Sequence, residues 1–175
     1  MDSKEKEWYV LRVQAREEEK ARELLVQNGL DVKVIYRDVY WKKNGVVEMK
    51  RRVLFPGYLF VLSELNAYDF NELFQNIKFK YGKYYKNLKY DQEGTPALTS
   101  EEKKLIIHLT GDNDVVEKST GIIEGDQVII MDGPLMGLEG NIVHIDRHKR
   151  LAKLEMDFLG TTRTITVSLE IVIKR

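Results

Sequence analysis

Cysteine is absent from this chain of 175 residues, and its absence excludes several kinds of chemistry. Without thiols the protein has no disulfides, no thiolate zinc site and no cysteine nucleophile, a composition that fits a reducing cytosol. The sequence also lacks an apolar run long enough to span a bilayer. Residues 1–6 are polar and charged, unlike a signal peptide. We therefore expect a cytoplasmic protein with no membrane partner.

Catalytic and metal-binding patterns are missing as well. His108, His144 and His148 have no metal-ligand spacing among them, and no nucleophile–base arrangement stands out. The acidic run at 17–19 suits the first turn of a helix, where carboxylates interact favourably with the helix dipole. We expect no metal, no cofactor and no enzymatic activity, and a small hydrolase is the alternative that these residues do not favour.

Net charge is also lacking, because 28 lysines and arginines balance 28 acidic residues. This balance argues against a disordered tail and against a globally basic nucleic-acid binder. The charges are nevertheless unevenly distributed along the chain. Residues 77–90 hold several lysines and no acidic residue, and the lysines alternate with the aromatic residues Phe79, Tyr81, Tyr84, Tyr85 and Tyr90. That composition suits stacking on single-stranded bases, for example of upstream or non-template DNA. A strand hairpin with core aromatics and exposed lysines is the alternative.

Periodicity predicts alternating strands and helices in the first part of the chain. Asn66 suits the N-cap of a helix, and Thr99 and Glu102 have capping-box spacing before a helix whose apolar face holds Leu105, Ile106 and Leu109. Residues 43–46 carry a hairpin turn signal. The expected elements are strands at 8–13, 31–41, 47–51 and 58–62, and helices at 17–28, 66–77 and after Thr99.

The last part of the chain changes to short strands with tight turns. Residues 110–120 mix Gly, Asp, Asn and Ser without periodicity, which predicts a linker. The expected strands that follow lie at 127–131, 141–145, 151–158, 161–167 and 171–173. Short strands in so small a segment favour a five-stranded β-barrel, since closure removes exposed edges. The fold class is therefore α+β: an antiparallel sheet with flanking helices, followed by a small barrel.

The chain is organised around residues 51–61, where a strand turns at Pro56 and Gly57. Proline fixes its own φ and donates no amide hydrogen, so it belongs at the first residue or the edge of a strand. Tyr58 and Phe60 share one face of the following strand, because side chains alternate with a period of two. The segment is either a plain central strand or one that also offers aromatic side chains outward.

Several motifs together resemble the NusG family of transcription elongation factors. Phe55-Pro56-Gly57-Tyr58 and a downstream KOW pattern around Asp132-Gly133-Pro134 carry most of the resemblance. Residues 8–10, 96–99, 124–128 and 137–143 match the family in the same order. The resemblance implies an N-terminal NGN domain at 1–109, a flexible linker at 110–120 and an SH3-like KOW domain at 121–175, in a protein expected to be a monomer.

The resemblance also implies a mechanism. In the family, the N-terminal domain lays an apolar concave surface on the clamp helices of the RNA polymerase largest subunit and suppresses pausing. By position, that surface would here consist of Phe55, Pro56, Tyr58 and Phe60, with Tyr84 and Tyr85 as additions. We expect the rings to form an accessible apolar patch, and rings fully enclosed within the first domain would make this docking wrong, and the assignment with it. The KOW domain of the family recruits ribosomal protein S10, the termination factor Rho or RNA.

Two departures from the family pattern favour a specialised paralogue that resembles the LoaP antiterminators. Leu135 and Leu138 stand where housekeeping members usually have aromatic residues. The next hairpin is strongly basic, which suits phosphate binding and recognition of an RNA hairpin. Its candidate nucleic-acid residues are His144, Arg147, His148, Lys149, Arg150 and Lys153. A solvated β-turn is the structural alternative for this cluster.

Three functions therefore stay open. The first is a processive antitermination factor whose KOW domain recruits an RNA hairpin. The second is a housekeeping factor that modulates pausing and termination through Rho or ribosomal protein S10. The third is a ribosome-associated RNA-binding protein, since KOW motifs also occur there. In some relatives the C-terminal domain folds as a helical hairpin; alternating β-branched residues at 142–145 and 161–167 predict a β fold here.

Overall fold

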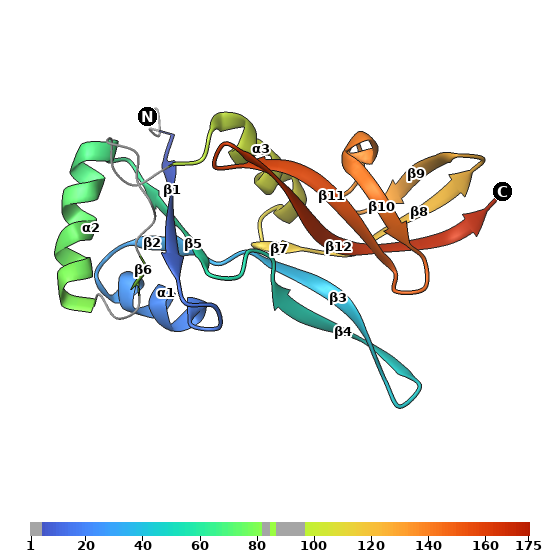
Figure 1. Ribbon diagram of the computed structural model, residues 1–175, viewed down its shortest axis with the longest axis horizontal. Coiled ribbons are helices and arrows are strands. Elements are labelled where there is room, and N and C mark those ends of the chain that lie inside the picture. Colours follow the sequence, from blue (N-terminus) through green and yellow to red (C-terminus); the bar gives the residue numbers. More distant parts are fainter. Residues whose placement is uncertain (1–4, 82–84, 87–96) are drawn as a thin grey trace. The chain divides into compact units, whose positions relative to one another are not determined.

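The computed structural model describes residues 5–81, 85–86 and 97–175 (Figure 1). The chain forms two compact units: Met1–Val34 together with Phe55–Lys103, and Ile35–Leu54 together with Lys104–Arg175. Within the described part of the chain, every helix is too short or too polar to cross a membrane. The architecture is α+β, as the sequence predicts.

The first unit is built on a sheet of strand order β2-β5-β1-β6. Its strands are β1 (Glu7–Val13), β2 (Asp31–Lys33), β5 (Tyr58–Ser63) and β6 (Tyr85–Lys86), and its helices are α1 (Glu18–Gln27) and α2 (Ala67–Tyr81). All neighbouring strands of this sheet run antiparallel. The Tyr9 ring of β1 stacks on Phe70 of α2 with 3.9 Å between ring centres. Helix α2 therefore packs on the face of the sheet that carries Tyr9.

Both predicted helix caps are confirmed. The Asn66 side chain accepts a hydrogen bond from the main-chain amide of Asp69 at 2.9 Å, at the start of α2. Helix α3 (Ser100–Thr110) begins with a complete capping box. There the Thr99 hydroxyl accepts from the Glu102 amide at 3.2 Å, and the Glu102 carboxylate accepts from the Thr99 amide at 2.9 Å. Local sequence thus decides where these helices begin.

The second unit contains a long hairpin, β3 (Tyr36–Lys43) and β4 (Val46–Val53), whose sheet has the order β4-β3-β7 with β7 at Val115–Val116. Asn44 and Gly45 make the predicted turn with φ values of 52° and 79°. The single strand expected at 31–41 is wrong: the chain breaks between β2 and β3. Val34 and Ile35 are both buried there, and two successive buried residues interrupt the alternation of a one-sided strand.

The C-terminal strands form a five-stranded sheet of order β10-β11-β12-β8-β9, which confirms the predicted β fold. The strands are β8 (Ser119–Glu124), β9 (Gln127–Asp132), β10 (Ile142–Asp146), β11 (Leu151–Phe158) and β12 (Thr161–Lys174), with a short 3-10 helix η2 (Glu139–Asn141) before β10. Two details differ from expectation. Strand β8 forms where the sequence predicts no strand. The strands expected at 161–167 and 171–173 are one continuous strand, β12.

The segment predicted as a linker, 110–120, contains β7 and the first residues of β8. Val115, Val116 and Ser119 are buried, and β7 runs parallel to the start of β3. The Gly, Asp, Asn and Ser residues of this segment suggest a loop, but Val115 and Val116 form the third strand of the β4-β3-β7 sheet. The Lys/aromatic stretch also differs from the expected strand hairpin, since residues 77–81 are the last turn of α2; apart from β6, the rest of it lies outside the described residues.

Strand β12 lies beside β3 within the second unit. The Arg37 guanidinium donates to the main-chain carbonyl of Thr166, and the Ser168 hydroxyl donates to the carbonyl of Asp38 at 2.6 Å. These contacts, with the pairing of β3 and β7, place the β3–β4 hairpin in the same compact unit as the C-terminal sheet. The units thus divide the chain differently from the predicted domains 1–109 and 121–175, whose boundaries stay a prediction.

Candidate functional site

The Pro56-Gly57 turn is fixed by main-chain contacts to two other elements. Gly57 has a φ of 82°, a left-handed conformation that glycine adopts without strain. Its carbonyl accepts a hydrogen bond from the Val13 amide at 2.8 Å, and its own amide donates to the Glu18 carboxylate at 2.8 Å. The turn is therefore held between the end of β1 and the first turn of α1, which sets the start of β5.

Strand register places the aromatic side chains of β5 on the sheet face opposite α2. Tyr58 lies across from Arg12, and Phe60 lies across from Val10, whereas Tyr9 points to the α2 face. The Arg12 guanidinium carbon lies 5.3 Å from the centre of the Tyr58 ring, and an Arg12 nitrogen donates to the Tyr58 hydroxyl at 3.4 Å. The predicted face-sharing of Tyr58 and Phe60 is confirmed by this register.

Ring contacts join three aromatic residues on that face. The Phe60 ring centre lies 5.6 Å from Phe55 in an edge-to-face arrangement and 6.2 Å from Trp8. Such pairs add to the stability that burial provides. The three rings form one packed cluster within the first unit.

The expectation of an accessible apolar patch is wrong for this structure. Phe55 is 3% exposed, Tyr58 6% and Phe60 0%, so the rings are core side chains, and Pro56 is the exposed member of the set. Tyr84 lies outside the described residues, and Tyr85 belongs to β6, where its side chain is outside them too. The physical reason is that both faces of β5 are covered: Leu59 and Phe60 lie on opposite faces of the strand, and each is 0% exposed.

The basic hairpin between β10 and β11 has a defined turn. Asp146 at the end of β10 accepts a hydrogen bond from the Lys149 amide at 2.9 Å, and the Lys149 ammonium lies 3.9 Å from the same carboxylate. The main-chain hydrogen bond is the chief cause that lowers the pKa of Asp146. Arg150 closes the turn with a φ of 52°. The turn thus presents its side chains from a fixed backbone.

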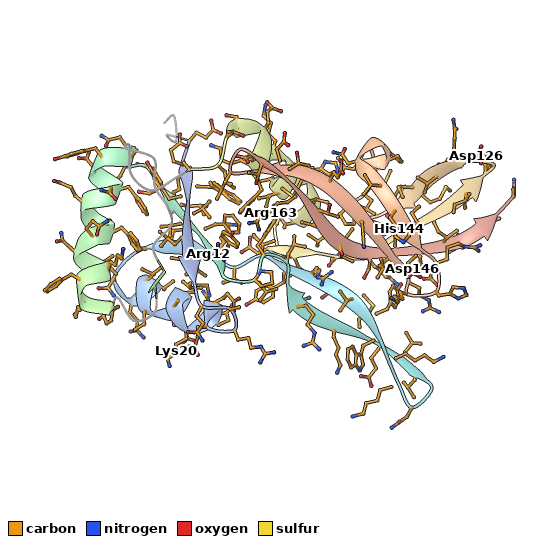
Figure 2. All side chains as sticks on the ribbon, in the orientation of Figure 1. Arg12, Lys20, Asp126, His144, Asp146 and Arg163 are labelled. Atoms are coloured by element: carbon orange, nitrogen blue, oxygen red, sulfur yellow. The ribbon has the colours of Figure 1, made fainter. Side chains whose placement is uncertain are left out.

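Most of the predicted nucleic-acid residues lie together on this turn and are exposed. His144 and Lys153 are register partners across β10 and β11, so they share one face. His144 and Asp146 both come from β10 (Figure 2). The exposed members are His144, Arg147, His148, Lys149 and Lys153.

Arg150 differs from the other members because it is half-buried and already engaged. Its guanidinium carbon lies 5.0 Å from the centre of the Tyr40 ring, and its Nε lies 4.0 Å from the Glu170 carboxylate. The Tyr40 hydroxyl donates to the same carboxylate at 3.2 Å. Burial, followed by the interaction with Glu170, raises the pKa of Tyr40. Sequence reasoning missed Tyr40 and Glu170, which lie far from Arg150 along the chain and carry no motif.

The loop after Asp132-Gly133-Pro134 offers no exposed aromatic or leucine side chain. Leu135 is fully buried, and its amide donates to the Ser119 hydroxyl at 3.0 Å; Leu138 is half-buried. The neighbouring strands β9 and β10 and this loop do expose other apolar side chains, namely Met131, Met136 and Val143. Among the described residues, no cluster of three or more His, Asp or Glu side chains could hold a metal ion.

Comparisons with known proteins agree with this architecture. A family model described as "Transcription termination factor nusG" matches residues 6–86, and the KOW motif model matches residues 124–157. The first match runs from β1 to β6 and includes both the Pro56-Gly57 turn and the β3–β4 hairpin, and the second covers β9, β10 and nearly all of β11 with the basic hairpin.

Curated relatives match along almost the whole chain. A "Transcription termination/antitermination protein NusG" of Streptococcus pyogenes serotype M3 is 30% identical over 97% of this chain and 96% of its own length. The protein of the same description from Borreliella burgdorferi is 26% identical, over 93% and 95%. A solved structure titled "Domain interaction in Thermotoga maritima NusG" covers 95% of this chain and 94% of its own, with a TM-score of 0.53 and 22% identity, a likeness of fold.

Proposed function

This chain belongs to the NusG family, and we propose that it acts as a transcription elongation factor of the antitermination type. In this proposal the N-terminal domain, residues 1–109, binds the clamp helices of the RNA polymerase largest subunit. The KOW domain, residues 121–175, recruits an RNA hairpin. Family membership supports the role in transcription, and the two contacts are argued below from the side chains.

The observation that carries the RNA contact is the exposed basic turn between β10 and β11. Arg147, His148 and Lys149 follow one another at its tip, and His144 and Lys153, which are register partners on β10 and β11, are exposed as well. Clustered Lys and Arg side chains gain binding energy by releasing counterions from phosphates. A folded RNA hairpin offers closely spaced phosphates and splayed loop bases, which fit a short rigid turn.

The RNA contact can be tested with a labelled pool of RNA stem–loops and the full chain in a filter-binding assay. The double variant Arg147→Glu and Lys149→Glu should lose most of the affinity, and affinity for the unaltered chain should fall steeply with salt. A matched control reverses two exposed lysines of the same unit, Lys104→Glu and Lys118→Glu, and should bind nearly as well as the unaltered chain. Equal losses in both double variants would contradict a site at the turn.

The polymerase contact needs a further condition, because the rings of Phe55, Tyr58 and Phe60 are buried. Their sheet face has to become accessible before a helix can dock on it. A few aromatic side chains carry most of the energy of such a helix-in-groove contact. Removing Phe55 and Tyr58 should therefore weaken binding by roughly 2 to 4 kcal/mol.

The matched control for this experiment is Leu59→Ala. Leu59 is as buried as Phe60, but it lies on the opposite face of β5, so its loss destabilises the same sheet without altering the aromatic face. Polymerase should co-purify with the Leu59→Ala chain and not with the Phe55→Ala and Tyr58→Ala double variant. If the double variant retains polymerase, the clamp contact lies elsewhere. A chain that never retains polymerase but binds RNA would favour the ribosome-associated alternative.

A second candidate for the KOW domain is favoured by its exposed apolar side chains. Met131, Met136 and Val143 are each about half exposed, and methionine is common at protein-binding surfaces. A housekeeping factor of this family would use such a surface to recruit Rho or ribosomal protein S10. Pull-down with each purified protein tests it: binding that is lost in Met131→Ser with Met136→Ser, but kept in the Arg147 and Lys149 double variant, supports protein recruitment.

A further inference from the structure

The β3–β4 hairpin is strongly cationic in a chain whose formal net charge is zero. Its acidic residues are Asp38 and Glu48, and its basic residues are Arg37, Lys42, Lys43, Lys50, Arg51 and Arg52. Arg37 donates to the Thr166 carbonyl, and Arg51 pairs with the Asp38 carboxylate. Positive charge lies along the whole hairpin: Lys42 and Lys43 adjoin the turn, and Arg37, Arg51 and Arg52 lie in the half away from it. The turn end stands clear of the other strands of its unit (Figure 1).

The same hairpin exposes apolar side chains. Trp41 is 42% exposed, and Val46, Val47 and Met49 around the turn are exposed to a similar or greater extent. Charged residues on an edge strand such as β4 have a common structural role, since they prevent pairing with other sheets. That role explains the lysines and arginines, but it does not explain why the indole ring of Trp41 is exposed beside them.

Register shows how the indole and the cations are arranged. Trp41 lies opposite Glu48, and Lys50 and Arg52 follow at alternate positions of β4, so Trp41, Lys50 and Arg52 share one face of the hairpin. The Lys50 ammonium lies 4.6 Å from the indole centre, and the Arg52 guanidinium carbon lies 5.7 Å from it. Lys42, Met49 and Arg51 belong to the opposite face. We call Trp41, Lys50 and Arg52 the indole face.

We propose that the indole face binds single-stranded nucleic acid. An unpaired base stacks on the indole ring, and Lys50 and Arg52 contact the phosphates on either side of that base. Base–aromatic stacking next to a cationic track is the usual way in which proteins hold single strands without reading their sequence. A duplex fits this site poorly because its bases are already stacked on one another and offer no free face to the indole.

The site is separate from the basic turn that the proposed function uses. The indole face lies on β3 and β4, whereas the turn joins β10 and β11. The two proposals therefore fail independently. Loss of RNA hairpin binding at the turn leaves the indole face intact, and the reverse also holds.

Tryptophan fluorescence gives a local readout. The chain has two tryptophans, and Trp8 is 7% exposed, so quenching by an added oligonucleotide reports on Trp41. Oligo-dT and oligo-rU of about twelve nucleotides, a length within the usual range of single-strand sites, are the probes for DNA and RNA. Both should quench the emission, and a duplex of the same length should not. The probe that binds more tightly shows whether DNA or RNA is the favoured ligand.

Binding of the same labelled probes, followed by anisotropy, tests the residues. Trp41→Ala should weaken binding about tenfold, in line with the loss of one stacked base. Lys50→Ala with Arg52→Ala should weaken binding and reduce its salt dependence by nearly two phosphate contacts. The matched control is Lys42→Ala with Arg51→Ala, which removes the same charge from the opposite face of the same strands and should have a clearly smaller effect.

Four results would overturn the proposal. One is an equal loss in the two double variants, which would mean that only the total charge of the hairpin matters. Another is duplex binding as tight as single-strand binding. A third is binding by anisotropy without any quenching of Trp41. The Arg147→Glu and Lys149→Glu chain should still quench, and if it does not, the binding belongs to the basic turn alone.

Discussion

The carboxylate of Glu18 accepts a hydrogen bond from the main-chain amide of Gly57 at 2.8 Å, with both residues buried. Glu18 stands in the first turn of α1, and Gly57 stands just before β5. A carboxylate this deeply buried is unusual for a surface helix and is explained by the amide that it satisfies. The contact fixes the turn that aims the aromatic side chains of β5.

Replacement of Glu18 by alanine should therefore destabilise the protein by about 1 to 3 kcal/mol, the typical penalty for leaving a buried donor without an acceptor. Urea unfolding of the full chain measures the change. Glu18→Gln is the control, because its amide oxygen still accepts from Gly57, and it should recover most of the stability. Equal losses in the two variants would mean that packing, rather than the hydrogen bond, gives Glu18 its role.

Gly57→Ala should be more destabilising than Gly29→Ala, although both glycines have left-handed φ values, of 82° and 84°. The strain of that backbone conformation, of order 1 kcal/mol, is common to both variants. At Gly57 the added Cβ would also lie 3.1 Å from the Val13 carbonyl oxygen, whereas at Gly29 it would meet nothing within 4 Å. Thermal melting of the two variants side by side checks this order, and a reversed order would contradict it.

Thr99→Ala should cost about 1 kcal/mol, because the Glu102 amide at the start of α3 loses its side-chain partner. Thr99→Ser keeps the hydroxyl and serves as the control. Amide hydrogen exchange resolves the effect locally: protection should fall in the first turn of α3 and stay unchanged in β11. A uniform fall in protection across the chain would show that the cap stabilises the whole fold and not only the start of α3.

Stability at alkaline pH should depend on Tyr40. Burial, then Glu170, raises its pKa above the ordinary value of 10.0, so the folded protein holds the phenol proton more tightly than the unfolded chain does. The stability that this proton contributes is fully present below the unfolded pKa and is lost as the pH rises through the folded one. Tyr40→Phe removes the phenol, so its unfolding midpoint should fall less between pH about 9 and pH about 11. A parallel fall in both proteins would contradict this.

Local chemistry made much of the fold predictable from the sequence. Asn44-Gly45 and the Thr99–Glu102 spacing lie within a few residues of the backbone that they shape, and their turn and capping box form as expected. The period of two correctly put Tyr58 and Phe60 on one face. The same pattern could not tell whether that face is exposed, because burial depends on what packs above it.

The sequence by itself determined the α+β class, the family and the sites where helices and turns begin, since these depend on neighbours along the chain and on residue order. Only the tertiary structure decided that Phe55, Tyr58 and Phe60 are enclosed and that Arg150 meets Tyr40 and Glu170. It alone placed the β3–β4 hairpin in the unit of the C-terminal sheet. These outcomes rest on contacts between residues distant in the chain, for which no local pattern carries a signal.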